Sequence, residues 1–258
     1  MISVLASDQI EMYHRDGFLT CPDFFYNTKH AQLLDWVEEV SQWEDPELCV
    51  HHRELTESGP VLARTERFLS SHAGLRELLT TGKLISAISQ LFGEPACLFK
   101  EKINYKHPGG GGFAPHQDSA AYHRFGSEHI TCLVAIDANT VENGCLWFAP
   151  GHHRDGMLPM NDVGCLPSND ADQMPWVAAP LEPGGVLFFS SFVPHQSAVN
   201  DSQISRRSLY VTYSKVREGN LRDAYYQDRT QVMHEHSDEE SRASRISTIG
   251  HFQGKVVE

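Results

Sequence analysis

A histidine and an aspartate two residues apart, His116 and Asp118, follow a run of four glycines in the segment "GGGGFAPHQD". An imidazole nitrogen and a carboxylate oxygen are both common ligands of non-haem Fe(II). In extended backbone the side chains of residues i and i+2 point to the same side, so both groups can reach one metal ion. The same spacing recurs at His14, His153 and His236, so the tripeptide alone does not identify a site.

A second histidine and an arginine distinguish the pair at His116 from the others. An iron site with two histidines and one carboxylate needs another imidazole and keeps three open positions. His195 ends the strongly β-prone run "GGVLFFSSFVPH", and Arg206 opens the next β-prone run eleven residues later. A guanidinium grips a carboxylate through two parallel hydrogen bonds, so Arg206 is suited to an acidic ligand. The pair at His236 lies in an acidic tail with no later strand to complete such a site.

Three stretches of the chain differ in their predicted secondary structure, and together they must position these residues. Residues 1–95 carry helical periodicity and predict a mostly helical N-terminal part. Residues 96–216 hold short β-prone segments separated by Gly and Pro turns, which predicts an antiparallel jelly roll. Residues 217–258 are polar and are expected to form a C-terminal extension. The predicted fold class is α+β, mainly β: one domain, a double-stranded β-helix (jelly roll, cupin-like) with an N-terminal helical buttress.

Composition excludes some classes of partner. The chain has 258 residues, 40% of them hydrophobic, and a formal net charge of −13, which disfavours nucleic acid and anionic membranes. No apolar run approaches the roughly 20 residues that span a bilayer. Six scattered cysteines without a C-x-x-C pair predict reduced thiols. We therefore expect a cytoplasmic protein whose partner is a small-molecule substrate.

The motifs "HQD", "NGCLWFAPGHH" and "PGGVLFF…PHQSAVN…RRSLYVTY" resemble those of the phytanoyl-CoA dioxygenase family of Fe(II)/2-oxoglutarate oxygenases. The resemblance runs from about Leu98 to Ser214. It implies Fe(II) as cofactor, with 2-oxoglutarate and O2 as cosubstrates, and a C–H hydroxylation that yields succinate and CO2. By the same resemblance Arg206, assisted by Ser197, would hold the distal carboxylate of 2-oxoglutarate. The implied iron ligands and catalytic centre are His116, Asp118 and His195.

Two questions about the cosubstrate site depend on which way a strand faces. Adjacent strand residues face opposite sides, so either Arg206 or Arg207 points inward, and the eleven-residue spacing from the distal histidine favours Arg206. Further contacts are expected from the strand "LFKEKINYK". One face of it carries Lys100, Lys102 and Asn104, and the other carries Glu101, Ile103 and Tyr105. The sequence does not decide between these faces. The preceding glycine run is expected to be a mobile loop over the site.

The expected substrate contacts are Tyr122, His123 and Arg124, which follow the metal motif directly, and Tyr105. An arginine and a histidine beside iron suit an anionic group such as a phosphonate. Within the family, "GGGFAPHQDSAAY" and "RISTIGHFQGK" are similar to bacterial hydroxylases of 2-aminoethylphosphonate, which act on the carbon next to phosphorus. That compound is the leading expectation, and an ectoine-like or amino-acid-like metabolite is the alternative.

Two other classes of function remain open on the sequence alone. One is a non-catalytic cupin-like protein that binds metal or ligand without turnover. The other is a metal-dependent isomerase or hydrolase on the same barrel, which would need neither O2 nor Arg206.

Overall fold

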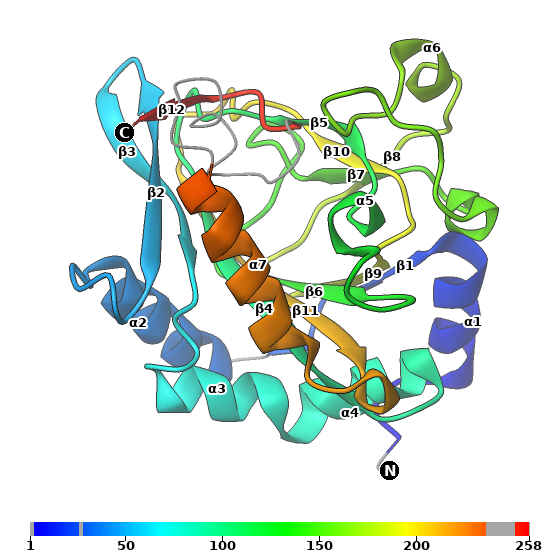
Figure 1. The fold of residues 1–258 in the computed structure, drawn as a ribbon. Coiled ribbons are helices and arrows are strands. Elements are labelled where there is room, and N and C mark those ends of the chain that lie inside the picture. Colours follow the sequence, from blue (N-terminus) through cyan, green and yellow to red (C-terminus); the bar gives the residue numbers. More distant parts are fainter. Residues whose placement is uncertain (1–2, 26–27, 236–250, 258) are drawn as a thin grey trace.

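Two antiparallel sheets face each other in the computed structural model, which describes residues 3–25, 28–235 and 251–257 (Figure 1). The larger sheet has the strand order β1 (Phe18–Cys21), β9 (Val186–Ser190), β6 (Ile130–Ala135), β11 (Arg206–Lys215), β4 (Ala96–Lys106), β3 (Gly59–Glu66), β2 (Val50–Thr56) and β12 (Lys255–Val257). The smaller has the order β5 (Phe113–His116), β10 (His195–Ser197), β7 (Leu146–Phe148) and β8 (Val177–Ala179). Two such sheets make the jelly roll that the turn-separated strands predict.

Four helices cover the outer face of the larger sheet, as the expected buttress. They are α1 (Ser7–Asp16), α2 (Thr28–Ser41), α3 (Ala73–Thr80) and α4 (Gly82–Phe92), and their apolar side chains share one core with that sheet. The remaining helical segments are α5 (Ser119–Tyr122), α6 (Ser168–Ala171), α7 (Leu221–Glu235) and the short 3-10 turns His152–Asp155 and Val216–Glu218. None of the described helices is long and apolar enough to cross a bilayer.

Strand alternation divides the core into two layers and decides what points between the sheets. In β11, Leu209, Val211 and Tyr213 pack against the helices, whereas Tyr210 packs between the two sheets. Successive strand residues face opposite sides, so Arg206 shares the inward face of Tyr210. The layer between the sheets therefore receives a guanidinium from a strand that is otherwise strongly apolar.

The N-terminal part is less helical than its periodicity predicts. Val50–Glu66 forms the hairpin β2–β3, and β3 pairs with β4, where Arg64 lies opposite Asn104. The sequence "VHHRELT" lacks clean apolar alternation because both faces of β2 carry polar side chains. This hairpin lengthens the larger sheet beyond the predicted core and brings charged residues to it.

The C-terminal extension is part of the fold at two places. Helix α7 runs across β4 (Figure 1), and its Arg222 forms an ion pair with Glu101 of that strand. Strand β12 pairs with β2 through Val256 and Glu54 and forms the edge of the larger sheet. The segment 236–250 lies outside the described residues.

Candidate metal and cosubstrate site

The two histidines of the predicted triad lie directly opposite each other on paired strands. In the antiparallel ladder of β5 and β10, His195 is the register partner of His116. Asp118 follows β5 at the first turn of α5, and its Oδ1 lies 3.9 Å from Nε2 of His116. Ligand atoms of all three residues lie within 4.8 Å of one another, and all three residues are buried. The antiparallel return therefore brings the third residue to the first two, a geometry that suits one metal ion.

Hydrogen bonds to the backbone orient both imidazoles. Nδ1 of His116 lies 2.7 Å from the carbonyl oxygen of Ala114, and Nδ1 of His195 lies 3.1 Å from that of Val193. A carbonyl oxygen only accepts, so each Nδ1 must carry the proton and each Nε2 keeps its lone pair. This arrangement is characteristic of metal-binding histidines.

The protonation states of the triad are those that bind a metal. Burial, reinforced by His195, lowers the pKa of His116 to about 3. Burial also lowers the pKa of His195. Burial alone would raise the pKa of Asp118, but His195 and Lys102 hold it below its usual value. Neutral imidazoles and an ionised carboxylate at neutral pH are ready ligands, because no proton must leave first.

Gln117, between the two residues of the motif, points away from the metal site. Its Nε2 donates to the carbonyl oxygens of Gly156 at 2.9 Å and Phe192 at 2.5 Å. Its Oε1 accepts from the backbone N–H of Leu158 at 2.8 Å. This fully buried amide ties the motif to two neighbouring loops and limits how far the triad can shift.

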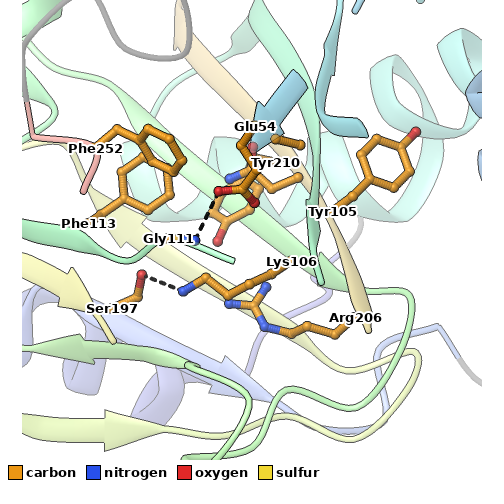
Figure 2. Close-up of a pocket in the computed structure, with 11 residues that line it drawn as sticks. Glu54, Tyr105, Lys106, Gly111, Phe113, Ser197, Arg206, Tyr210 and Phe252 are labelled. Atoms are coloured by element: carbon orange, nitrogen blue, oxygen red, sulfur yellow. Dashed lines mark hydrogen bonds between the residues drawn. The ribbon is translucent and has the colours of Figure 1, made fainter. Parts of the chain in front are cut away.

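A second cavity beside the triad is lined by Arg206, Lys106 and Ser197 (Figure 2). The guanidinium donates to the carbonyls of Asn143 at 3.1 Å and Gly144 at 2.5 Å, and to Ser208 Oγ at 3.0 Å. Lys106 Nζ donates to Ser197 Oγ at 3.1 Å. Both cations are buried, and the carboxylate of Glu54, whose pKa is raised by burial, lines the same cavity. Among the lining residues two cations thus face one carboxylate, which favours an anionic ligand in this cavity.

Lys106 was not identified from the sequence, although it ends the strand from which contacts were expected. Burial, reinforced by the neighbouring Arg206, lowers its pKa to about 7. An anion bound between the two cations would favour the charged ammonium. Binding in this cavity is thus coupled to the protonation of Lys106 near neutral pH.

Arg206 and Arg207 point to opposite faces of β11, and Arg206 is the inward one, as its spacing from His195 favours. Arg207 lies on the other face of β11, where it forms ion pairs with Asp137 at 2.8 Å and Glu38 at 3.1 Å. On β4, Lys102 and Asn104 line the cavity of the triad, whereas Ile103 packs in the core beneath the helices. The face that carries Lys100, Lys102 and Asn104 is thus the inward one.

None of the four expected substrate contacts is among the residues that line the cavity of the triad. Tyr105 lies in the core on the helix side, where its hydroxyl accepts a hydrogen bond from Thr65, and its ring points away from the neighbouring cavity in Figure 2. His123 and Arg124 are exposed, and Arg124 forms an ion pair with Asp228 of α7. The short helix α5 (Ser119–Tyr122) comes between the metal motif and His123 and Arg124, although these residues follow the motif closely in the sequence.

Tyr122 is buried one helical turn beyond Asp118. Its ring lies under the ammonium of Lys100, with the nitrogen 4.9 Å from the ring centroid. It packs in a small aromatic cluster with Phe99 and Tyr225. Tyr122 therefore packs against Lys100 on the inward side of β4, outside the lining of the triad cavity.

The rival His-x-Asp pairs form no comparable group. Nε2 of His153 lies 3.2 Å from the carbonyl oxygen of His14, at the end of α1. Asp155 contacts His152 on the surface. Within the described residues the triad is the group that fits a metal, and the pair at His236 lies outside them.

Comparison with known proteins agrees with this geometry. Residues 13–208 match the family model "Phytanoyl-CoA dioxygenase (PhyH)". The chain belongs to the phytanoyl-CoA dioxygenase family. It is therefore an Fe(II)- and 2-oxoglutarate-dependent oxygenase, as the resemblance implied, and this confirms the enzymatic class over a non-catalytic binding protein.

The chain is also similar to two curated relatives and to one solved structure. It is 46% identical to the methylphosphonate hydroxylase of Gimesia maris, over all of this chain and 99% of the relative. It is 35% identical to the 2-aminoethylphosphonate dioxygenase of the uncultured bacterium HF130_AEPn_1, over 88% of each chain. Among solved structures, EctD from S. alaskensis with 2-oxoglutarate and 5-hydroxyectoine matches with a TM-score of 0.70 at 20% identity, covering 84% of this chain and 78% of that one. This last likeness confirms the jelly-roll fold.

We expect Arg206→Met to weaken 2-oxoglutarate binding about 100-fold, because truncating one partner of a buried charge pair costs about 2–5 kcal/mol. Isothermal titration of the anaerobic Fe(II) enzyme with 2-oxoglutarate measures this. Arg207→Met, on the opposite face of the same strand, is the matched control and should change the dissociation constant little. Equal effects of the two substitutions would contradict the assignment.

The affinity for 2-oxoglutarate should also fall as the pH rises above about 7. The pKa of Lys106 is lowered to about 7 in the free site, so above that pH the lysine must take up a proton when the carboxylate binds. The dissociation constant should then rise by up to about tenfold per pH unit. Titrations at several pH values check this, and Lys106→Met should bind weakly with a flat pH profile. A wild-type profile that is flat between pH 6.5 and 8.5 would rule out this coupling.

Proposed function

We propose that this oxygenase hydroxylates the carbon next to phosphorus in a short alkylphosphonate, with methylphosphonate the first candidate. One oxygen atom of O2 would enter the C–H bond, while the other would enter the succinate formed, with CO2, from 2-oxoglutarate. Balanced over one turnover, R–H, 2-oxoglutarate and O2 give R–OH, succinate and CO2. The names of the two phosphonate-acting relatives support this proposal.

The observation that carries the proposal is a group of cations on the inward side of β3, β4 and α7. This basic cluster consists of the buried Arg64, Lys100 and Arg229 and the half-buried Lys102. Glu66 is the carboxylate that pairs with it among the described residues, at 3.3 Å from both Arg64 and Arg229. The cluster therefore carries more positive than negative charge.

Lys102 extends this cluster to the metal site. It lines the cavity of the triad, and its Nζ forms no hydrogen bond with another described residue. Burial, reinforced by Arg64 and Lys100, lowers its pKa well below the usual value. Arg64 lies directly behind the lining, where its Nε donates to Asn104 Oδ1 at 3.0 Å. A dianionic phosphonate beside Lys102 would relieve this repulsion and restore the charged ammonium.

The rest of the lining favours a small uncharged group on the phosphonate. Phe113, Leu146 and Phe189 supply the apolar part of the cavity. Asp118 is the carboxylate among the lining residues, and it is proposed to hold the metal. A terminal ammonium, as in 2-aminoethylphosphonate, finds no second carboxylate there. On this ground the proposal puts methylphosphonate first, whereas 2-aminoethylphosphonate was the leading expectation from the sequence.

The chain's own residues divide the work of this reaction. His116, Asp118 and His195 would hold Fe(II), which with 2-oxoglutarate and O2 supplies the oxidation. Arg206, Lys106 and Ser197 would orient the distal carboxylate of 2-oxoglutarate. Lys102 and the cations behind it would hold the phosphonate so that its carbon faces the metal, and the apolar lining would exclude water.

We expect methylphosphonate to drive succinate formation with kcat/KM at least about tenfold above 2-aminoethylphosphonate. Desolvating an ammonium without a partner costs more than the roughly 1.4 kcal/mol that a factor of ten represents. Succinate assays and phosphorus NMR of the α-hydroxy product measure the preference. Ectoine and amino acids form the comparison panel, and turnover of one of these in preference to both phosphonates would disprove the proposal.

Lys102→Met should raise KM for the phosphonate by about 10- to 100-fold, because a charge-assisted hydrogen bond contributes about 1.5–3 kcal/mol. Binding of 2-oxoglutarate to the variant should remain close to that of the wild type. Lys29→Met, which removes an exposed lysine on α2, is the matched control. If both variants keep the wild-type KM, Lys102 is not the phosphonate ligand.

A further inference from the structure

We propose that the C-terminal strap, residues 251–257, is a working part of the active site, with His251 the positioning residue that fixes the metal ligand His116. The strap lies beyond the residues 13–208 that match the family model. The inference uses the proposed roles of the triad and of the 2-oxoglutarate cavity. It does not depend on the phosphonate.

The ring of His251 stacks on the ring of His116. The two centroids are 3.7 Å apart and the planes differ by 12°. His251 is buried and lines the cavity of the triad. A flat ring in this position blocks rotation of the His116 imidazole out of its plane. Packing of this kind around a metal ligand sets its orientation.

Backbone hydrogen bonds connect the same two residues through Ala114. The carbonyl of His251 accepts from the N–H of Ala114 at 2.8 Å, and the carbonyl of Ala114 accepts from Nδ1 of His116 at 2.7 Å. The strap therefore contacts the ring of His116 and also binds Ala114, the residue whose carbonyl fixes its tautomer. Displacing the strap would release both constraints at once.

The next residue of the strap closes the second cavity. Phe252 lines the cavity of Arg206 and Lys106, with its ring against that of Phe113 at a centroid distance of 5.1 Å (Figure 2). Phe113 in turn borders the cavity of the triad. Adjacent residues of the strap thus complete the metal cavity and the proposed 2-oxoglutarate cavity.

Close contact between two glycines holds the strap in place. A Cβ added to Gly111 would lie 2.4 Å from Cα of Gly254, and one added to Gly254 would lie 2.5 Å from Oε2 of Glu54. That carboxylate also accepts the N–H of Gly111 at 3.0 Å. The run Gly110–Gly112 is therefore buried packing surface for the strap, and the expectation of a mobile loop over the site does not hold for it.

The metal half of the proposal is tested with Co(II) alone, titrated anaerobically and followed by its visible absorption. His251→Ala should weaken Co(II) binding about tenfold, within the range known for residues that orient ligands. His251→Phe retains a flat ring and should restore most of the affinity, with a Co(II) spectrum like that of the wild type. His123→Ala, an exposed histidine outside the site, is the matched control.

The cosubstrate half uses 2-oxoglutarate titrated into the Co(II)-loaded protein. Phe252→Ala should weaken 2-oxoglutarate several-fold while Co(II) binding stays unchanged. Gly111→Ala mutates no residue of the strap, but the added methyl group should push the backbone of the strap away from residue 111. The affinities for Co(II) and for 2-oxoglutarate should therefore both fall. Thermal unfolding by circular dichroism verifies that each variant is folded.

Wild-type affinities for Co(II) in His251→Ala and in Gly111→Ala would overturn the proposal. So would a His251→Phe protein that is folded but as weak as His251→Ala, because the stacked ring would then not be the cause. All these readouts omit the phosphonate, so they remain decisive even if the enzyme acts on another substrate.

Discussion

The pairing of two short strands, β5 and β10, is the constraint on which the site depends. Their register places His195 directly opposite His116, and cross-strand partners of this kind lie about 5 Å apart at Cβ. A slip of one residue would turn one of the imidazoles to the other face of the sheet. Gln117 opposes such a slip, because its three hydrogen bonds connect the intervening residue to both adjacent loops. The metal geometry is therefore set by backbone pairing before any ligand binds.

The layer between the two sheets also contains several cationic side chains. The inward faces of β3, β4 and β11 carry Arg64, Lys102, Lys106 and Arg206 into a layer that would otherwise be apolar. Removing cations from water costs free energy, and the lowered pKa values of Lys102 and Lys106 reflect that cost. Glu66 pairs with Arg64, and Glu54 lines the cavity of Lys106, but the cations outnumber these carboxylates. Two anions, the distal carboxylate of 2-oxoglutarate and an anionic substrate, would offset the remaining positive charge.

The sequence predicts what depends on local spacing and fails where the answer depends on distant contacts. His116, Asp118, His195 and Arg206 were predicted from two β-prone runs, the eleven-residue spacing and the family resemblance. The inward face of β4 and the role of Lys106 required the register with β11, which no local pattern contains. Arg64 was missed because residues 1–95 were expected to be mostly helical, whereas Val50–Glu66 forms the β2–β3 hairpin. His123 and Arg124 were expected at the site because they follow the motif in the sequence, but one turn of helix comes between them and Asp118, and both side chains are exposed.

The glycine run shows why a contact between distant segments cannot be predicted from either segment alone. Glycines before a metal motif suggest freedom of motion, since glycine adopts many conformations. Here Gly111 is required by close approach, and the group that approaches it is another glycine 143 positions later, Gly254. The need for a glycine at either position is evident only from their close contact in the folded chain. Because the strap they admit carries His251 against His116 and Phe252 against Phe113, the C-terminal end of the chain and the metal motif form one packed unit.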